Sequence, residues 1–121
     1  MTIMTYDNLI NLLFEKFPNL KQDYINEGEY IEGLPHLCYP IVFVPYIKEI
    51  ITNNDLDNLL KICEFLEEMS ICTEERVREV LIASILESIL SERRLVERLK
   101  SYLKERTAEF LMLLEKTYGW V

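Results

Sequence analysis

The sequence predicts an all-α fold of six or seven helices in stacked antiparallel pairs. Apolar residues recur every three or four positions over most of the chain, which is helical spacing. No stretch of useful length alternates between apolar and polar residues, as a half-buried strand would. The chain has only 3 glycines and 4 prolines in 121 residues, so long flexible linkers are not expected. A chain of this length buries its own core, and we expect one domain over residues 1–121.

Capping residues, prolines and glycines set the expected helix boundaries. Thr5 suits the N-cap of the first helix, Asp55 that of the fourth, and Gly119 the end of the last. In chain order we expect helices over residues 6–17, 19–26, a segment ending at 52, and then 56–69, 74–90, 92–103 and 105–118. The helix over 74–90 is apolar nearly all round, which places it at the centre of the bundle. It forms a hairpin with the helix before it, and the helix pairs on either side suggest a HEAT-like stack.

The apolar stripes predict which side of each helix faces the core. In the helix over 56–69 the stripe consists of Leu56, Leu59, Leu60, Cys63, Leu66 and Met69. In the last two helices the expected inward residues are Leu95, Leu99, Tyr102, Leu103, Phe110, Leu111, Leu113 and Leu114.

The segment LPHLCYPIVFVPYI, residues 34–47, is the most ambiguous part of the chain. Pro35 or Pro40 would suit the first turn of a buried helix, where the missing N–H costs nothing. Pro45 inside that helix should kink or divide it, at a cost of ~3 kcal/mol. We therefore expect Pro40 or Pro45 to mark the start of the helix. The alternation in IVFV leaves a short strand as the alternative.

Residues capable of catalysis or metal binding are few. His36 and Cys38 lie close together, but structural zinc sites pair their ligands at short spacings, and Cys63 and Cys72 are nine residues apart. No acid or amide in the sequence is placed to orient a Cys–His nucleophile. We expect a buried thiol and a partly buried imidazole, with no enzymatic activity, no bound metal and no cofactor.

The carboxylates on the helices over 56–69 and 74–90 do not predict a metal site either. A di-metal bundle would need a Glu-x-x-His motif, and the single histidine is not part of one. We therefore expect a solvated acidic helix face formed by Glu64, Glu67 and Glu68. Ser84 and Glu87, three residues apart on a largely apolar helix, are expected to form a buried polar pair, either toward the hairpin or toward a partner.

Charge and cysteine content narrow the classes of partner. The 21 acidic and 13 basic residues give a net charge of −8. The first 80 residues carry 15 acids and 6 bases, and the remaining 41 carry 6 acids and 7 bases. This field repels nucleic acid and anionic membranes and would speed encounter with a basic partner. Taken alone, however, the charge is explained by solubility and does not require a cationic partner. The basic stretch over 93–106 is interleaved with Glu92, Glu97 and Glu105, which is typical of a salt-bridged helix surface.

Two further patterns bear on membrane insertion and on the cellular compartment. The longest uncharged run, residues 33–47, has 15 residues and three prolines, whereas a membrane-spanning helix needs ~20 apolar residues. Three cysteines at irregular spacing favour reduced thiols in a cytoplasmic protein.

Several motifs resemble a known family. They are LFEKFPNLKQDY near the N-terminus, GLPHL, LLKICEFLEEM and VREVLIASILESIL, and together they span roughly residues 8–103. The chain is similar to a family of short, acidic, all-helical bacterial proteins of unknown function. Members of that family recur beside polymorphic toxins and are regarded as immunity proteins. The last helix, ending in LEKTYGWV, is longer than this resemblance implies.

The resemblance implies a cytoplasmic protein that binds and neutralises a cognate toxin domain, such as a basic nuclease. Tyr30 is the expected anchor, because aromatic residues flanked by charge are typical of binding hot spots. The full pool of expected partner contacts is Glu27, Glu29, Tyr30, Glu32, Asp55, Asp57, Glu64, Glu67 and Glu68. The alternative is a helical adaptor or oligomerisation module, and the chain could be a monomer or a homodimer.

Overall fold

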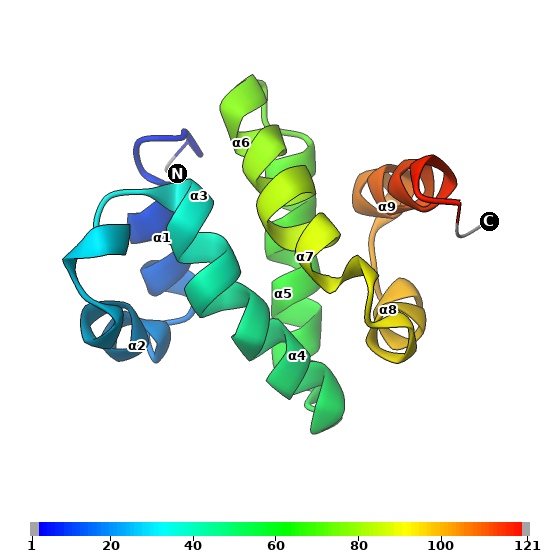
Figure 1. Cartoon of the computed structure of the whole chain (residues 1–121), viewed down its shortest axis with the longest axis horizontal. Coiled ribbons are helices and arrows are strands. Elements are labelled where there is room, and N and C mark those ends of the chain that lie inside the picture. Colours follow the sequence, from blue (N-terminus) through cyan, green and yellow to red (C-terminus); the bar gives the residue numbers. More distant parts are fainter. Residues whose placement is uncertain (1–2, 120–121) are drawn as a thin grey trace.

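A computed structural model describes residues 3–119, and within that range the chain consists of helices joined by short turns (Figure 1). If each continuous helical run is counted once, the described residues form 7 helices and contain no strand. The predicted all-α class is therefore confirmed. Residues 1, 2, 120 and 121, which the expected domain includes, lie outside the described residues.

The elements follow one another with connections of a few residues. In chain order they are α1 (Leu9–Lys16), α2 (Leu20–Glu27), the 3₁₀ turn η1 (Glu29–Ile31), α3 (Pro35–Cys38), the π-helical segment η2 (Tyr39–Phe43), α4 (Val44–Thr52), α5 (Leu56–Ser70), α6 (Glu75–Glu79), the π-helical segment η3 (Val80–Leu86), α7 (Glu87–Leu90), α8 (Arg93–Lys100) and α9 (Glu105–Thr117).

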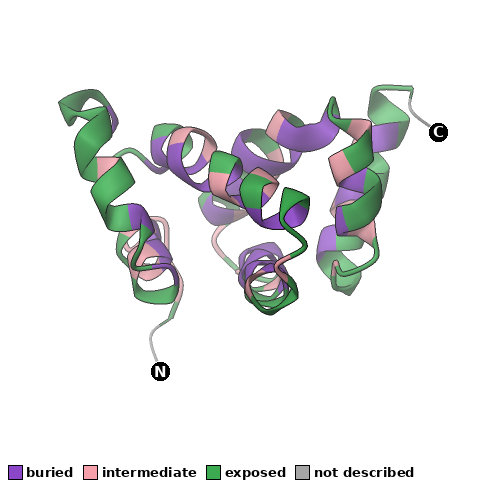
Figure 2. Ribbon diagram, turned by 90° about the horizontal axis from the view of Figure 1, so that it is seen from below, coloured by how far each residue is buried: buried purple, intermediate pink, exposed green. Residues whose placement is uncertain are grey.

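The helices form three groups along the longest axis of the molecule (Figure 1). The centre holds three long helices: α3–η2–α4, α5 and α6–η3–α7. The pair α1–α2 lies on one side and the pair α8–α9 on the other, and both pairs run across the direction of the central helices. Buried residues concentrate in the central helices and on the inner faces of the outer pairs (Figure 2).

Of the two expected N-caps, the structure has one. Helix α1 begins at Leu9 with Asn8 as its N-cap residue, so the predicted N-cap at Thr5 is wrong. Thr5 Oγ1 accepts a hydrogen bond from the Asn8 amide at 3.3 Å, and Asn8 Oδ1 accepts one from the Thr5 amide at 2.8 Å. Asp55 caps α5, because its Oδ1 accepts a hydrogen bond from the Asn58 amide. The Asp55 bond satisfies an amide that the first turn of a helix leaves without a partner, whereas the Thr5–Asn8 pair closes the turn before α1.

The buried helix of the proline-rich segment begins at Pro35, so the predicted start at Pro40 or Pro45 is wrong. Both of those prolines lie inside the continuous run from α3 to α4, and the alternative strand is absent. Val44 donates its amide to the Tyr39 carbonyl, five residues back rather than four. This wider π-helical turn accommodates the missing proline donors without ending the helix.

The two π-helical segments η2 and η3 pack against each other at the centre of the fold. Ser84 of η3 is buried at this contact, and its Oγ lies 3.4 Å from both Nδ1 and the carbonyl oxygen of His36. Pro40 has no N–H to donate to that carbonyl, so the serine hydroxyl supplies a donor in its place. Glu87 is exposed, so a Ser84–Glu87 pair buried in the hairpin is wrong, and a pair toward a partner stays a prediction. His36 is also exposed, rather than partly buried.

Four aromatic side chains form the middle of the core. Phe17, Tyr39, Phe43 and Phe65 are all buried, and their ring centroids lie 5.4–6.4 Å apart where the rings are in contact. The Tyr39 hydroxyl donates a 2.7 Å hydrogen bond to the Leu9 carbonyl, which satisfies its polar end inside the core. This cluster joins α1 to two of the central helices.

Some of the expected inward residues lie on the surface instead. On α5, Leu56 is 48% exposed and Leu60 is 47% exposed, whereas Ile62 and Phe65 are buried. Tyr102 and Leu113 are also exposed, and Val96 is buried although the stripe did not include it. An amphipathic pattern locates an apolar face but cannot show which edge of it a neighbouring helix covers.

Candidate protein-binding surface

Ion pairs are distributed unevenly along the chain. Each carboxylate that pairs with a base among the described residues lies between Glu92 and Glu115. None of the 15 acidic residues from Asp7 to Glu79 forms an ion pair with a described base. Among the described residues, the carboxylates of the N-terminal two thirds of the chain therefore have no lysine or arginine as an ion-pair partner, although Asp55 and Glu67 accept hydrogen bonds within the fold.

Part of this charge lines a groove between α2 and the helix formed by η2 and α4. The groove has a volume of about 560 Å³, and the carboxylates of Asp23, Glu27 and Glu49 line it without a lysine or arginine. Its apolar wall includes Pro45 and Tyr46. We call this the acidic groove.

The ionisation of Tyr46, in the wall of the acidic groove, is shifted by burial and by nearby carboxylates. Burial and the charges of Asp55 and Glu49 raise the pKa of the Tyr46 hydroxyl, and a hydrogen bond with Asn19 only partly offsets them. The groove thus combines a half-buried aromatic wall with carboxylates, an arrangement suited to long basic side chains.

The predicted contacts at the end of α2 lie next to the acidic groove. Glu27 lines it and accepts a 2.7 Å hydrogen bond from the hydroxyl of Tyr30. This bond raises the pKa of Tyr30, which is 57% exposed on η1 beside the exposed Glu29. Glu32 is also exposed but lines a different groove, on the other side of α2.

The predicted contacts on α5 and at its N-cap are not among the residues that line the acidic groove, although the charge of Asp55 acts on Tyr46 in its wall. Asp55 accepts hydrogen bonds from the Asn58 amide at 3.3 Å and from its side chain at 2.8 Å. Asp57 and Glu64 are exposed. Glu68 is exposed too and lines a separate cavity of about 320 Å³ with residues of the N-terminal segment. Binding through any of these residues stays a prediction.

Glu67 has an internal role, because its carboxylate reaches the first turn of α9. It accepts hydrogen bonds from the Thr107 amide at 3.0 Å, the Thr107 hydroxyl at 2.9 Å and the Arg106 amide at 3.2 Å. Burial acts to raise the pKa of Glu67, but these hydrogen bonds outweigh it and lower the pKa. The carboxylate therefore caps α9 from another helix.

Replacing Glu67 by alanine should lower the free energy of unfolding by about 1 kcal/mol, as the loss of a helix cap does. The contribution is present above the ordinary glutamate pKa and disappears as the pH falls through the lowered pKa of the folded state. Urea denaturation at pH 7 measures the loss. The exposed neighbour Glu68, replaced by alanine, is the matched control, and equal losses in the two variants would contradict the capping role.

Asp23 and Glu49 belong to the acidic groove although the sequence did not single them out. Asp23 lies four residues before Glu27 on the same helix, so i, i+4 spacing could have found that pair. Glu49 comes from α4 and meets them only through the tertiary packing of η2 against α2. No local signal marks that contact.

Two of the three cysteines have thiols whose ionisation is shifted by burial. Burial raises the pKa of Cys38 to about 12 and that of Cys63 to about 11, although nearby Lys104 opposes the second shift. Both thiols are therefore protonated at neutral pH. Among residues 3–119, no group of three or more metal-binding side chains is placed to hold an ion. The same described residues include no helix long and apolar enough to cross a bilayer.

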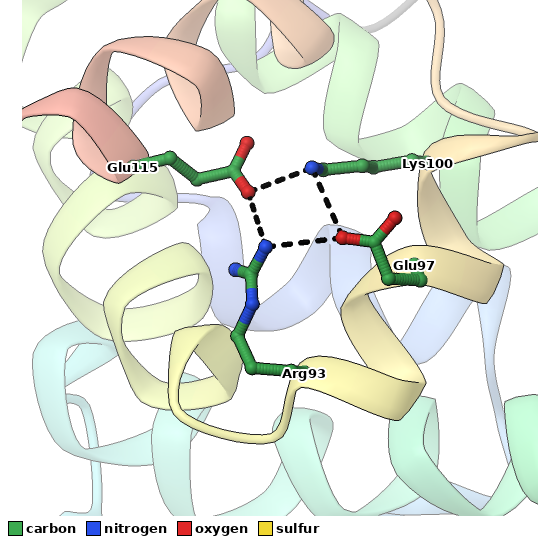
Figure 3. Close-up of polar contacts among 4 residues, drawn as sticks. All are labelled: Arg93, Glu97, Lys100 and Glu115. Carbon is green, nitrogen blue, oxygen red and sulfur yellow. Dashed lines mark hydrogen bonds and ion pairs between the residues drawn. The ribbon is translucent and has the colours of Figure 1, made fainter. Parts of the chain in front are cut away.

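The basic stretch on α8 forms ion pairs, as predicted, but its main partner was not anticipated. Figure 3 shows Arg93 and Lys100 around two carboxylates, Glu97 of α8 and Glu115 of α9. Arg93 lies 2.6 Å and Lys100 2.7 Å from Glu115, and the same two bases lie 3.0 and 3.3 Å from Glu97. The side chain of Glu115 is only 3% exposed. This network fastens α9 to α8.

Most of the chain matches one known protein family. Residues 10–119 match a family described as "Domain of unknown function (DUF7674)". The chain belongs to this family. No curated protein and no solved structure matches the chain.

Proposed function

We propose that this protein binds a basic protein partner through the acidic groove and the adjoining η1 turn, and that it acts as an immunity protein that neutralises a toxin domain. The observation that supports this proposal is the set of carboxylates between Asp7 and Glu79 that have no ion-pair partner among the described residues. Negative charge that the fold leaves uncompensated is available to a positively charged surface.

The expected mode of action is coverage of the toxin rather than chemistry. Complementary charge raises the rate of encounter, and an aromatic anchor in a desolvated contact then slows dissociation. Tyr30, exposed at the rim beside Glu27 and Glu29, supplies such an anchor. A basic nuclease would present the complementary charge, because its own active surface must attract phosphate.

The alternative function is a helical adaptor or oligomerisation module without enzymatic activity. The exposed apolar side chains on α5 and at the end of α8, Leu56, Leu60 and Tyr102, favour it. Such residues are commonly found at protein–protein contacts. Analytical ultracentrifugation tests this alternative: a homodimer that leucine-to-serine changes at positions 56 and 60 dissociate would support it.

The main proposal is tested with a triple variant, Asp23→Asn, Glu27→Gln and Glu49→Gln. Its association rate with the protein encoded beside it should fall at least about tenfold at low salt, because steering depends on local charge. Surface plasmon resonance at two ionic strengths measures the rate. The triple variant Glu75→Gln, Glu79→Gln and Glu87→Gln is the control, since it removes the same charge from the exposed surface of α6 and α7. Equal slowing in both variants would contradict a specific role for the groove.

A further inference from the structure

A second groove lies on the other side of α2 and differs in character from the acidic groove. It has a volume of about 440 Å³, and the half-buried rings of Tyr6, Phe14 and Tyr24 line it. Asp7 and Glu32, both exposed, contribute carboxylates at its edge. We call it the aromatic groove.

The rings of the aromatic groove are held in place by contacts within the chain. Phe14 and Tyr24 have ring centroids 5.1 Å apart at a tilted angle. The Tyr24 hydroxyl accepts a 2.8 Å hydrogen bond from the Gly33 amide, which ties α2 to the loop that precedes α3. A preorganised wall of this kind costs little conformational entropy when a ligand binds.

One ring of the aromatic groove already makes a cation–π contact within the chain. The guanidinium carbon of Arg76 lies 3.7 Å from the centroid of the Tyr6 ring. Aromatic faces attract cations electrostatically, and arginine stacks on them more often than lysine does. Tyr6 therefore already holds one arginine, supplied by α6, beside the groove.

We propose that the aromatic groove is an anchor pocket for an arginine side chain of the basic partner. This inference rests on the proposed function only in taking the arginine from that partner. A planar guanidinium can stack on a ring and donate two N–H groups to one carboxylate, which the ammonium group of lysine cannot do. Lys21 lines the groove and Arg76 stacks on Tyr6 beside it, so the carboxylates of Asp7 and Glu32 balance two positive charges and recognition rests on the rings and on the geometry of the guanidinium.

The experiment uses the full chain and small probes, followed by two-dimensional NMR. Nα-acetyl-arginine amide should cause saturable shifts at Tyr6, Phe14, Tyr24 and Gly33 in the millimolar range. The citrulline analogue has nearly the same shape but no charge, and it should cause shifts at least fivefold smaller at equal concentration. The lysine analogue separates guanidinium recognition from general attraction of cations: weaker shifts support the proposal, and equal shifts overturn it.

Two double variants test where the probe binds. Asp7→Asn with Glu32→Gln should weaken arginine-probe binding at least threefold, because it removes both carboxylates of the aromatic groove. Asp23→Asn with Glu27→Gln removes the same charge from the acidic groove across α2 and should leave probe binding unchanged. Equal weakening by the two variants, or the absence of saturable shifts in the unmodified chain, overturns the proposal. Neither result bears on the acidic groove, whose test is the association rate of the partner.

Discussion

Replacing Phe65 by alanine should lower the free energy of unfolding by about 3–5 kcal/mol, the typical loss for a phenylalanine removed from a core. Phe65 is buried and its ring contacts those of Phe17, Tyr39 and Phe43, which belong to two other helices. Alanine at this position would leave a cavity at the meeting point of three helices. A close-packed interior relaxes only partly around such a cavity, so the loss exceeds the transfer free energy of the ring alone.

Urea denaturation followed by circular dichroism measures this loss. Tyr118→Ala is the control, because Tyr118 follows the end of α9 and is 55% exposed. The control should change the free energy of unfolding by less than about 0.5 kcal/mol. A loss below about 1 kcal/mol for Phe65→Ala would mean that the four-ring cluster is not the centre of the core.

Replacing Glu115 by alanine should cost about 2–3 kcal/mol. Removing one member of a buried ion pair commonly costs ~3–5 kcal/mol because it leaves the partner charge uncompensated. Here the partners Arg93 and Lys100 are 27% and 33% exposed, so water recovers part of that cost. The matched control on the same helix is Glu109→Ala, whose half-exposed pair with Arg106 at 3.7 Å contributes little.

The contribution of Glu115 to the free energy of unfolding should decrease as the pH is lowered. Burial acts to raise the pKa of Glu115, but Lys100 and Arg93 outweigh it and lower the pKa. A lowered pKa contributes stability that is complete above the ordinary value of 4.5 and is lost as the pH falls through the folded-state pKa. The difference in unfolding free energy between wild type and Glu115→Ala should therefore shrink in acid. A difference that does not vary between pH 7 and pH 3 would contradict the ion-pair explanation.

The helices and the Asp55 cap could be predicted from the sequence because their signals are local. The Asp55 cap acts over three residues and was expected from residue type and position. The apolar character of the segment from Val80 to Leu86 likewise indicated its central place. In each case the interactions that determine the feature join residues within one or two turns of helix.

The polar contacts of α9 could not be predicted because they join distant parts of the chain. Glu115 meets Arg93 across 22 residues, and Glu67 meets Thr107 across 40. Nothing near Glu115 in the sequence distinguishes a buried glutamate from an exposed one. The same is true of the acidic groove, where Glu49 lies against α2 only after the central helix has packed.

The π-helical segments could not be predicted from the sequence, because local preferences in this region point to a helix break instead. Pro45 inside a helix predicts a break when only α-helical hydrogen bonding is considered. The chain instead widens the turn before Pro45, so that the Val44 amide reaches the carbonyl of Tyr39. The neighbouring η3 packs against this widened turn, and tertiary contact thus decides a feature that local preference opposes.

The attachment of α9 has a consequence for the order in which the molecule opens. Its buried residues are Thr107, Leu111 and Glu115, Phe110 and Leu114 pack half-buried against the core, and carboxylates hold the helix near both of its ends. Protonation of those carboxylates would release both fastenings while the aromatic cluster between α1 and the central helices stays closed. The amides of α9 should therefore form a separate unit of hydrogen exchange, opening at lower free energy than the centre and becoming more labile in acid.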